Sequence, residues 1–190
     1  MSAPAVTRYR VARLTFDTGQ PYEKFRARYE AAVPARDLEQ PGAPAGRHAR
    51  LNEISTGAIA RSPHGFVLHW RAETVPRMTD AGEPQPSTAY LMGSDAVSER
   101  FYRQDPAMML CVPLRALIYI DAEGRTRFTV DQPSTLFSGF GDADIAMAGR
   151  ELDRRLACLL DALGIASGRL LRAAAWPVAA TVNGHEAAAG

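Results

Sequence analysis

Apolar residues recur along this chain with two periods, and each period predicts one kind of element. An alternation of apolar and polar residues, as in the Tyr-Arg-Val-Ala-Arg-Leu-Thr-Phe stretch at 9–16, is typical of a strand with one buried face. This alternation predicts strands over residues 9–16, 66–73, 89–92, 114–120 and 125–130.

The predicted strand at 66–73 has polar side chains on one of its faces. Strict alternation divides it between two faces, with Phe66, Leu68 and Trp70 on one and Val67, His69 and Arg71 on the other. We therefore expect His69 and Arg71 to share a face of the sheet.

Helical spacing of three or four residues marks two further stretches. The first stripe lies between Pro21, which suits a first helical position, and Pro34, and it consists of Tyr22, Phe25, Tyr29 and Val33. The second follows Asp142 and Asp144, either of which could cap the helix, and it consists of Ile145, Ala148, Leu152, Leu156, Leu159 and Leu163. Gly164 suits the end of that helix. A shorter helix is predicted at 95–103, with Ser94 as its N-cap.

The clearest local prediction is a β-hairpin over 114–130. Asp121 and Gly124 hold the first and fourth positions of a type I turn with a glycine bulge. The resulting register pairs Ile120 with Thr126, Ile118 with Phe128 and Ala116 with Val130. The opposite face of the hairpin is mixed and carries Leu117, Tyr119, Arg127 and Thr129.

Breaker residues divide the chain. The Gln-Pro-Gly-Ala-Pro-Ala-Gly cluster at 40–46 predicts a loop inside a partly helical insertion at 35–63. Residues 131–141 are also expected to be a loop, and 108–112 a buried apolar segment. We expect one α+β domain at 1–166, followed by a C-terminal extension at 167–190 with a short helix and a disordered tail.

Composition excludes some partners. The chain has 190 residues, a formal net charge of +1, two cysteines and 46% hydrophobic residues. So small a net charge argues against binding to nucleic acid or to an acidic membrane surface. Two cysteines and the absence of a secretory signal predict a soluble cytoplasmic protein. We expect no cofactor and no bound metal.

An ordered series of short motifs resembles one known family. The motifs are Pro86-Ser87-Thr88, Tyr90-Leu91-Met92-Gly93-Ser94, Asp105-Pro106, Val112-Pro113-Leu114-Arg115, the strand and acidic-glycine turn at 118–124, and Asp131-Gln132-Pro133. In this order they resemble the bacterial domain-of-unknown-function family 302. The resemblance implies an α+β fold similar to the TATA-binding-protein-like class, with an antiparallel sheet and helices packed on one face. It implies no catalytic residues, and the fold class alone does not imply DNA binding.

One set of polar residues could bind a ligand or take part in catalysis. If the strand at 66–73 lies beside the hairpin, His69, Arg71, Tyr119, Arg127 and Thr129 could line one site. Histidine could then act as an acid or base, and the arginines could bind an anionic or carbonyl group. The alternative interpretation is a solvated or dimer-forming sheet face.

Four other motifs have plain structural interpretations. Met108 to Cys111, with His64 or His69, has soft-ligand character, but Met and free Cys are common in apolar cores. Ser138 to Gly141 precedes a helix and could hold a phosphate, but Asp142 and Asp144 would repel that phosphate, so a flexible loop with an N-cap is the favoured interpretation. Asp142 and Asp144 are too few for a calcium loop. Capping, solvation and a turn explain three further acidic residues, Asp95, Glu99 and Asp105.

Three classes of function follow. The favoured hypothesis is a domain that binds a small molecule in a pocket between the sheet and its helices. The second is a small enzyme with His69 as acid or base beside Arg71, Tyr119 and Arg127. The third is a structural module that forms a homodimer through the mixed sheet face. The sequence does not decide whether any reaction is catalysed.

Overall fold

The computed structural model describes residues 6–35, 62–73, 85–94, 97, 102–167 and 171. Most of the predicted insertion, most of the helix predicted at 95–103 and nearly all of the C-terminal extension lie outside these residues. The strands are β1 (Arg13–Asp17), β2 (Val67–Glu73), β3 (Ser87–Gly93), β4 (Leu114–Ile120) and β5 (Thr126–Asp131). The helices are α1 (Tyr22–Ala32), η2 (Pro106–Leu110), α4 (Pro133–Phe137), η3 (Ser138–Phe140) and α5 (Ala143–Ala162).

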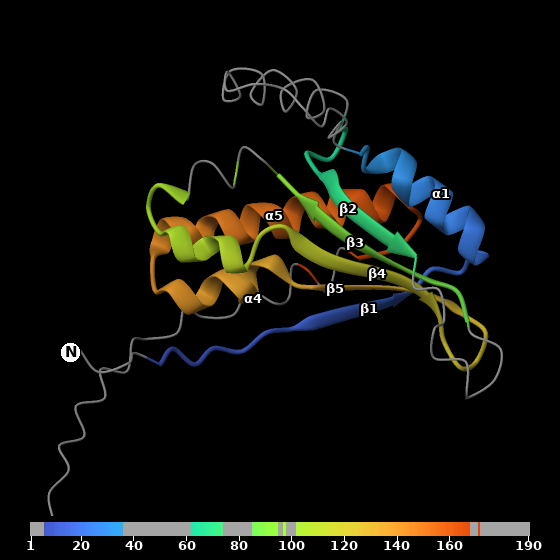
Figure 1. Ribbon diagram of the computed structural model, residues 1–190, viewed down its shortest axis with the longest axis horizontal. Coiled ribbons are helices and arrows are strands. Elements are labelled where there is room, and N and C mark those ends of the chain that lie inside the picture. Colours follow the sequence, from blue (N-terminus) through green and yellow to red (C-terminus); the bar gives the residue numbers. More distant parts are fainter. Residues whose placement is uncertain are drawn as a thin grey trace, which may run out of the picture.

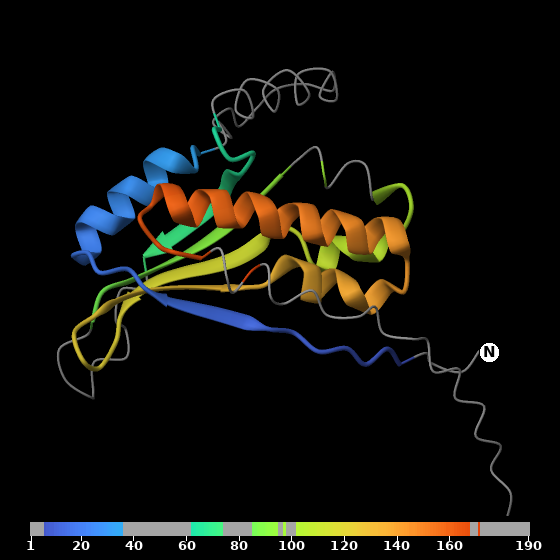
Figure 2. The same cartoon turned by 180° about the vertical axis from the view of Figure 1, so that it is seen from behind.

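The five strands form one antiparallel sheet in the order β1-β5-β4-β3-β2. Figures 1 and 2 show α1 and α5 on the same side of this sheet, with α4 beside α5. Among the described residues, no helix covers the opposite face, which we call the open face. The predicted α+β class, with helices on one face of an antiparallel sheet, is confirmed.

Aromatic rings join α1 to the covered face of the sheet. The ring of Phe128 on β5 lies 6.1 Å from that of Phe25 and 5.5 Å from that of Tyr29, centroid to centroid. Tyr29 also contacts Tyr90 of β3, with ring centroids 4.9 Å apart. These tilted pairs add to the free energy of burying the rings themselves. The predicted stripe of α1 is therefore the stripe that packs on the sheet.

The hairpin and the last helix form as predicted. β4 and β5 pair Ile120 with Thr126 and Ile118 with Phe128. Gly124 closes the turn with φ +76°, a conformation that glycine adopts without strain. At the start of α5, the carboxylate of Asp142 accepts hydrogen bonds from the backbone N–H groups of Asp144 and Ile145.

Three local predictions are wrong. β1 begins at Arg13 rather than residue 9, since the Ala12 N–H donates to the Thr135 hydroxyl instead of to a strand. Residues 131–141 are not a simple loop, because they contain α4 and η3. The 108–112 segment is only partly buried, and Leu110 is 89% exposed.

A close approach between α4 and α5 depends on a glycine. A Cβ atom added to Gly149 of α5 would lie 2.8 Å from the Cα of Ser134 and 3.1 Å from the Cβ of Phe137. The first of these neighbours is backbone and cannot rotate away. The two helices can therefore approach this closely only with glycine at position 149.

We predict that Gly149→Ala destabilises the protein. In an exposed helix this change stabilises by about 0.5–1 kcal/mol because alanine loses less backbone entropy. Here the overlap with α4 should reverse the sign and cost about 1–3 kcal/mol. Urea denaturation would measure the change, and an equal or higher unfolding free energy would contradict the close approach.

A buried polar pair connects the chain after β5 to α5. The Asp153 carboxylate accepts hydrogen bonds from the Gln132 side-chain amide at 2.8 Å and from the Ser134 backbone N–H at 3.0 Å. Burial raises the pKa of Asp153 above its usual value, although these hydrogen bonds oppose the shift. The Oε1 atom of Gln132 is buried and has no hydrogen-bond partner among the described residues.

The Asp153→Asn variant should therefore gain stability relative to the parent protein as the pH rises. Below the unfolded-state pKa of about 4, Asp153 is protonated in both states, and its burial carries no charge penalty. As the pH rises through the native pKa, the parent loses stability because only its unfolded state ionises freely. An asparagine at position 153 does not ionise, so the variant does not lose this stability. If the Gln132 amide rotates, its Oε1 can accept a hydrogen bond from the side-chain NH2 group of that asparagine.

Urea denaturation at pH 3.5 and pH 7 would test this prediction, with Asp153→Ala as the control. The alanine variant removes the carboxylate that accepts from the Gln132 amide and the Ser134 N–H, and it should lose about 2 kcal/mol or more at both pH values. Parallel stability profiles for the Asn variant and the parent would contradict the proposed cost of burying the Asp153 charge.

Candidate functional site

The open face of the sheet holds a depression of about 320 Å³. Its lining comes from every strand of the sheet and comprises Arg13, Trp70, Ala89, Tyr90, Leu91, Arg115, Ala116, Leu117, Thr129, Val130 and Asp131. Tyr90, Ala116 and Val130 are buried residues on the covered side of the sheet. The open-face side chains therefore define the depression.

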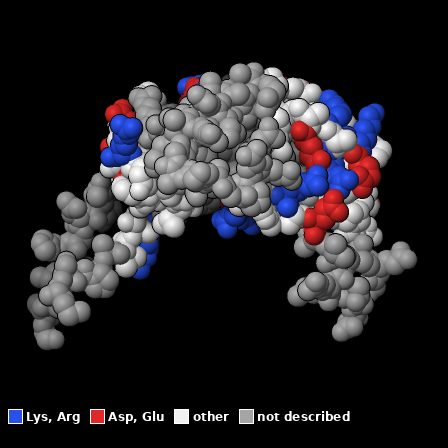
Figure 3. Space-filling model, turned by 45° about the horizontal axis from the view of Figure 1, so that its top comes forward, with Lys and Arg blue, Asp and Glu red and all other residues white. Residues whose placement is uncertain are grey.

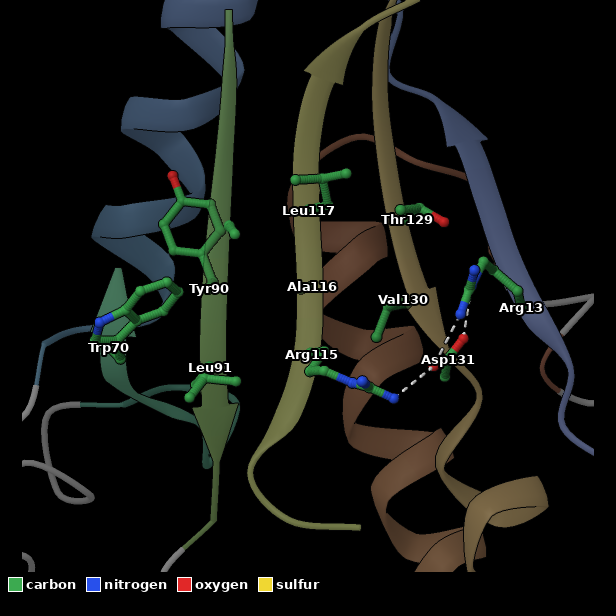
Figure 4. A pocket seen from close by; sticks show the side chains of 11 residues that line it. Arg13, Trp70, Tyr90, Leu91, Arg115, Ala116, Leu117, Thr129, Val130 and Asp131 are labelled. Atoms are coloured by element: carbon green, nitrogen blue, oxygen red, sulfur yellow. Dashed lines mark hydrogen bonds and ion pairs between the residues drawn. The ribbon is translucent and has the colours of Figure 1, made fainter. Parts of the chain in front are cut away.

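The floor of the depression is apolar. Leu91 and Leu117 lie on the neighbouring strands β3 and β4, and Ala89 pairs directly with Leu117. Figure 4 shows Leu91 and Leu117 facing the viewer, with Trp70 on one side and Arg13 and Arg115 on the other. Trp70 is 51% exposed, which is high for so large an apolar side chain.

The rim of the depression is charged. The Asp131 carboxylate accepts a hydrogen bond from Nε of Arg13 at 2.8 Å, and Nη2 of Arg115 lies 3.8 Å from its other oxygen. The two arginine side chains are 70% and 78% exposed, while Asp131 is nearly buried. One carboxylate thus faces two guanidinium groups, and one positive charge at this rim is not balanced by the residues that line it.

A β-bulge between Leu68 and Trp70 places Trp70 at this depression. The register shifts there, so that Leu68 pairs with Met92 and Trp70 pairs with Leu91. The extra residue, His69, inverts the alternation in the second half of β2. The predicted division of β2 into two faces is therefore wrong from Trp70 onward.

Arg71 lies on the covered side of the sheet as a result. It pairs across the strands with the buried Tyr90, and its Nη1 lies 3.1 Å from Glu30 of α1. Glu30 also accepts a hydrogen bond from the Tyr90 hydroxyl at 2.9 Å. Figure 3 shows acidic and basic side chains interspersed at the α1 end of the molecule. Arg71 therefore connects β2 to α1 and does not join the open face.

His69 lies on the open face but at one end of it. Its Nε2 is 2.9 Å from the position that a Cβ on Gly93 would occupy, so its ring covers that glycine. Tyr119 pairs with Ser87, six residues from Gly93 along β3 and therefore about 20 Å away at about 3.3 Å per residue. The sheet thus does not bring His69 together with Tyr119.

The hairpin members of the predicted set do lie together. Arg127 pairs with Tyr119 across the hairpin, and Thr129 donates a hydrogen bond to the Leu14 carbonyl at 2.8 Å. Arg127 is held by Asp121, with Nε 2.6 Å from the carboxylate, and by Asp17 at 3.5 Å. Its charge is therefore matched within the sheet, and Thr129 alone of the predicted set lines the depression.

The carboxylate that holds Arg127 has a shifted pKa. Desolvation acts to raise the pKa of Asp121, but hydrogen bonds from Arg125 and Arg127 outweigh it and hold that pKa well below the usual range. The interaction stabilises the hairpin turn and offers no proton near neutral pH.

Sequence reasoning missed most of the depression. Arg115 and Leu117 alternate with buried residues along β4, and that pattern could have identified them as open-face residues. The bulge that exposes Trp70 has no comparable signal, because residues 66–73 alternate regularly. The convergence of Arg13 and Arg115 on Asp131 depends on a pairing between residues far apart in the chain.

The other predicted motifs have structural roles. Asp105 caps η2 by accepting a hydrogen bond from the Ala107 N–H, and Cys111 is buried beside the Leu136 carbonyl. Residues 138–140 form η3, and Asp142 caps α5. Within the described part of the chain, no group of three or more His, Cys, Asp or Glu side chains could hold a metal ion. No helix in that part is long and apolar enough to cross a membrane.

Comparison with known proteins places this geometry in a family. A structural match covers 80% of this chain and 97% of an uncharacterized conserved protein DUF302 from Bacillus stearothermophilus, with a TM-score of 0.55 and 14% sequence identity. A likeness at this level of identity shows a shared fold only. No curated protein matches the sequence. The family model for the domain of unknown function DUF302 matches residues 60–163, from just before β2 to the end of α5 and more than half of the chain. The chain therefore belongs to the DUF302 family, as its ordered motifs predict.

Proposed function

We propose that the protein binds a small organic molecule in the open-face depression, and that this ligand combines a flat apolar part with an anionic group. The observation that carries the proposal is the combination of an apolar floor, an exposed tryptophan and an incompletely neutralised arginine pair in one hollow. A volume of about 320 Å³ suits a ligand of modest size.

Trp70 supports the apolar half of this proposal. Its indole lies on the open face because of the bulge, next to Leu91 of the adjacent strand. A flat ligand over Leu91 and Leu117 could contact the indole as well and would remove apolar surface from water. Such contacts favour an aromatic or ring-shaped ligand.

Arg115 supports the anionic half. Its 3.8 Å approach to Asp131 is too long for a hydrogen bond, although it is close enough for a weak ion pair. An anionic group at the rim could accept hydrogen bonds from this guanidinium without first breaking a strong pair. The arginine fork suits carboxylate, sulfonate and phosphate groups.

The lining favours binding over catalysis. It contains neither histidine nor cysteine, and its one carboxylate, Asp131, is engaged by Arg13. Formation of a homodimer through the open face would use the same exposed Trp70 and apolar floor. The two proposals differ in whether a second chain or a small molecule covers Leu91 and Leu117.

Anilinonaphthalene sulfonate is a suitable probe because it joins flat rings to one anionic group. The chain has two tryptophans, so the Trp176→Phe variant leaves Trp70 as the only donor for energy transfer to the bound probe. We predict that Leu117→Glu weakens probe binding by about tenfold, because it places a carboxylate on the apolar floor, equivalent to about 1.4 kcal/mol. Arg115→Gln should weaken it by about threefold.

Arg150→Gln is the matched control, since it removes the same charge from an exposed position on α5, on the other side of the sheet. It should leave probe affinity unchanged, and circular dichroism would confirm that each variant is folded. Equal affinities for the parent and Leu117→Glu would refute the proposed site. A concentration-dependent dimer that protects Trp70 from the probe would instead support the interface.

A further inference from the structure

We propose that the hollow between the 62–65 turn and α5 is a second binding site, specific for a small oxyanion. The hollow has a volume of about 530 Å³ and lies apart from the open-face depression, with no lining residue in common. Its lining consists of Ser62, Pro63, His64 and Gly65 from the turn and Glu151, Arg154, Arg155 and Cys158 from α5.

One carboxylate holds both arginines of this hollow. One oxygen of the Glu151 carboxylate accepts a hydrogen bond from Nη2 of Arg154 at 2.6 Å, and the other accepts one from Nε of Arg155 at 3.0 Å. The Nη1 group of Arg155 also donates to the Ser94 hydroxyl at 3.2 Å. Glu151 thus orients both guanidinium groups, and Ser94 holds Arg155 a second time, which lowers the entropy cost of ordering them around a ligand.

The charges of the lining do not cancel. Two arginines face a single acidic residue, so the lining carries one excess positive charge. The hydrogen bonds from Arg154 and Arg155 lower the pKa of Glu151 below its usual value, so its carboxylate stays ionised at neutral pH. Arg154 uses its Nε and Nη2 groups for Glu151, and among the described residues its Nη1 group has no acceptor.

The turn is shaped to fit Arg155. Gly65 has φ +72°, and a Cβ atom there would lie 2.8 Å from Nη1 of Arg155. Its N–H donates to the Ser62 carbonyl at 3.2 Å, and the Ser62 hydroxyl donates to the Phe66 carbonyl at 2.6 Å. These bonds hold the turn in shape, and the close approach at Gly65 leaves the Arg155 guanidinium directly beside backbone. The hollow therefore has one wall of hydrogen-bonded backbone, and it faces two guanidinium groups and a single carboxylate.

Cys158 provides a reporter for this site. It is exposed and lines the hollow, whereas the other cysteine, Cys111, is buried, and burial raises its thiol pKa. A disulfide reagent should therefore react first with Cys158. Its thiolate attacks one reagent sulfur, a mixed disulfide forms, and the second reagent half leaves as a thiolate. A Cys158→Ser variant identifies the fast phase.

The test compares the dianionic reagent dithiobis-nitrobenzoate with the uncharged reagent dithiodipyridine on the full chain. We expect Arg154→Gln to slow the reaction of Cys158 with the anionic reagent by about threefold or more. The reaction with the uncharged reagent should keep its rate, because only the anionic reagent is attracted by the excess positive charge. Arg150→Gln, with the same loss of charge one helical turn away and outside the hollow, should slow neither reagent. The rate of the anionic reagent with Arg154→Lys should lie between its rates with the parent protein and with Arg154→Gln.

Competition identifies the anion. At constant ionic strength, inorganic phosphate or acetate should protect Cys158 in the parent and should protect it less in Arg154→Gln, and the stronger competitor names the preferred oxyanion. Three results would each overturn the proposal. The first is that Arg154→Gln changes the reaction rates of both reagents equally. The second is that Arg150→Gln and Arg154→Gln slow the anionic reagent equally. The third is that neither phosphate nor acetate slows the modification of Cys158 in the parent.

Discussion

The packing of Phe25 and Tyr29 against Phe128 commits one face of the sheet to the core. Because side chains alternate along each strand, this commitment also decides which residues reach the other face. Phe128 faces inward, so its neighbours Arg127 and Thr129 face outward. Cross-strand pairing extends this division across the sheet, and the open face with its hollow is a direct consequence of where α1 packs.

Among the described strands, the bulge in β2 is the one departure from this alternation. Without it, Trp70 would follow Phe66 and Leu68 into the core, and Arg71 would face outward. With it, Arg71 reaches Glu30 on α1, and the indole becomes the edge of the open-face hollow. A bulge inserts one unpaired residue and redirects the side chains after it, and bulges are common beside binding sites. Here the inserted residue is His69, whose ring covers Gly93.

Local signals in the sequence predicted the parts of the fold that depend on local interactions. The turn at Asp121 and Gly124 set the hairpin register, and Asp142 and Gly164 marked the ends of α5. The bulge depends instead on how β2 fits β3, and the regular pattern of residues 66–73 does not encode it. For this reason Arg71 does not share a face with Tyr119 and Arg127, contrary to what the sequence had suggested.

The rim of the open-face hollow combines the matched family region with the chain before it. Arg115 and Asp131 lie within the matched residues, whereas Arg13 precedes them and reaches the rim through the pairing of β1 with β5. The second hollow lies wholly within the matched region, between the turn before β2 and α5. The two hollows share an excess of arginine over carboxylate, and they differ in that only the first has an apolar floor.

The claim that a small molecule covers the open face can be tested by isotope-filtered NMR of methyl-labelled leucines. The sample would mix labelled and unlabelled chains and contain anilinonaphthalene sulfonate. Our account predicts nuclear Overhauser contacts from the methyl groups of Leu91 and Leu117 to the protons of the bound probe. Contacts from these methyl groups to protons of the unlabelled chain, with none to the probe, would contradict it.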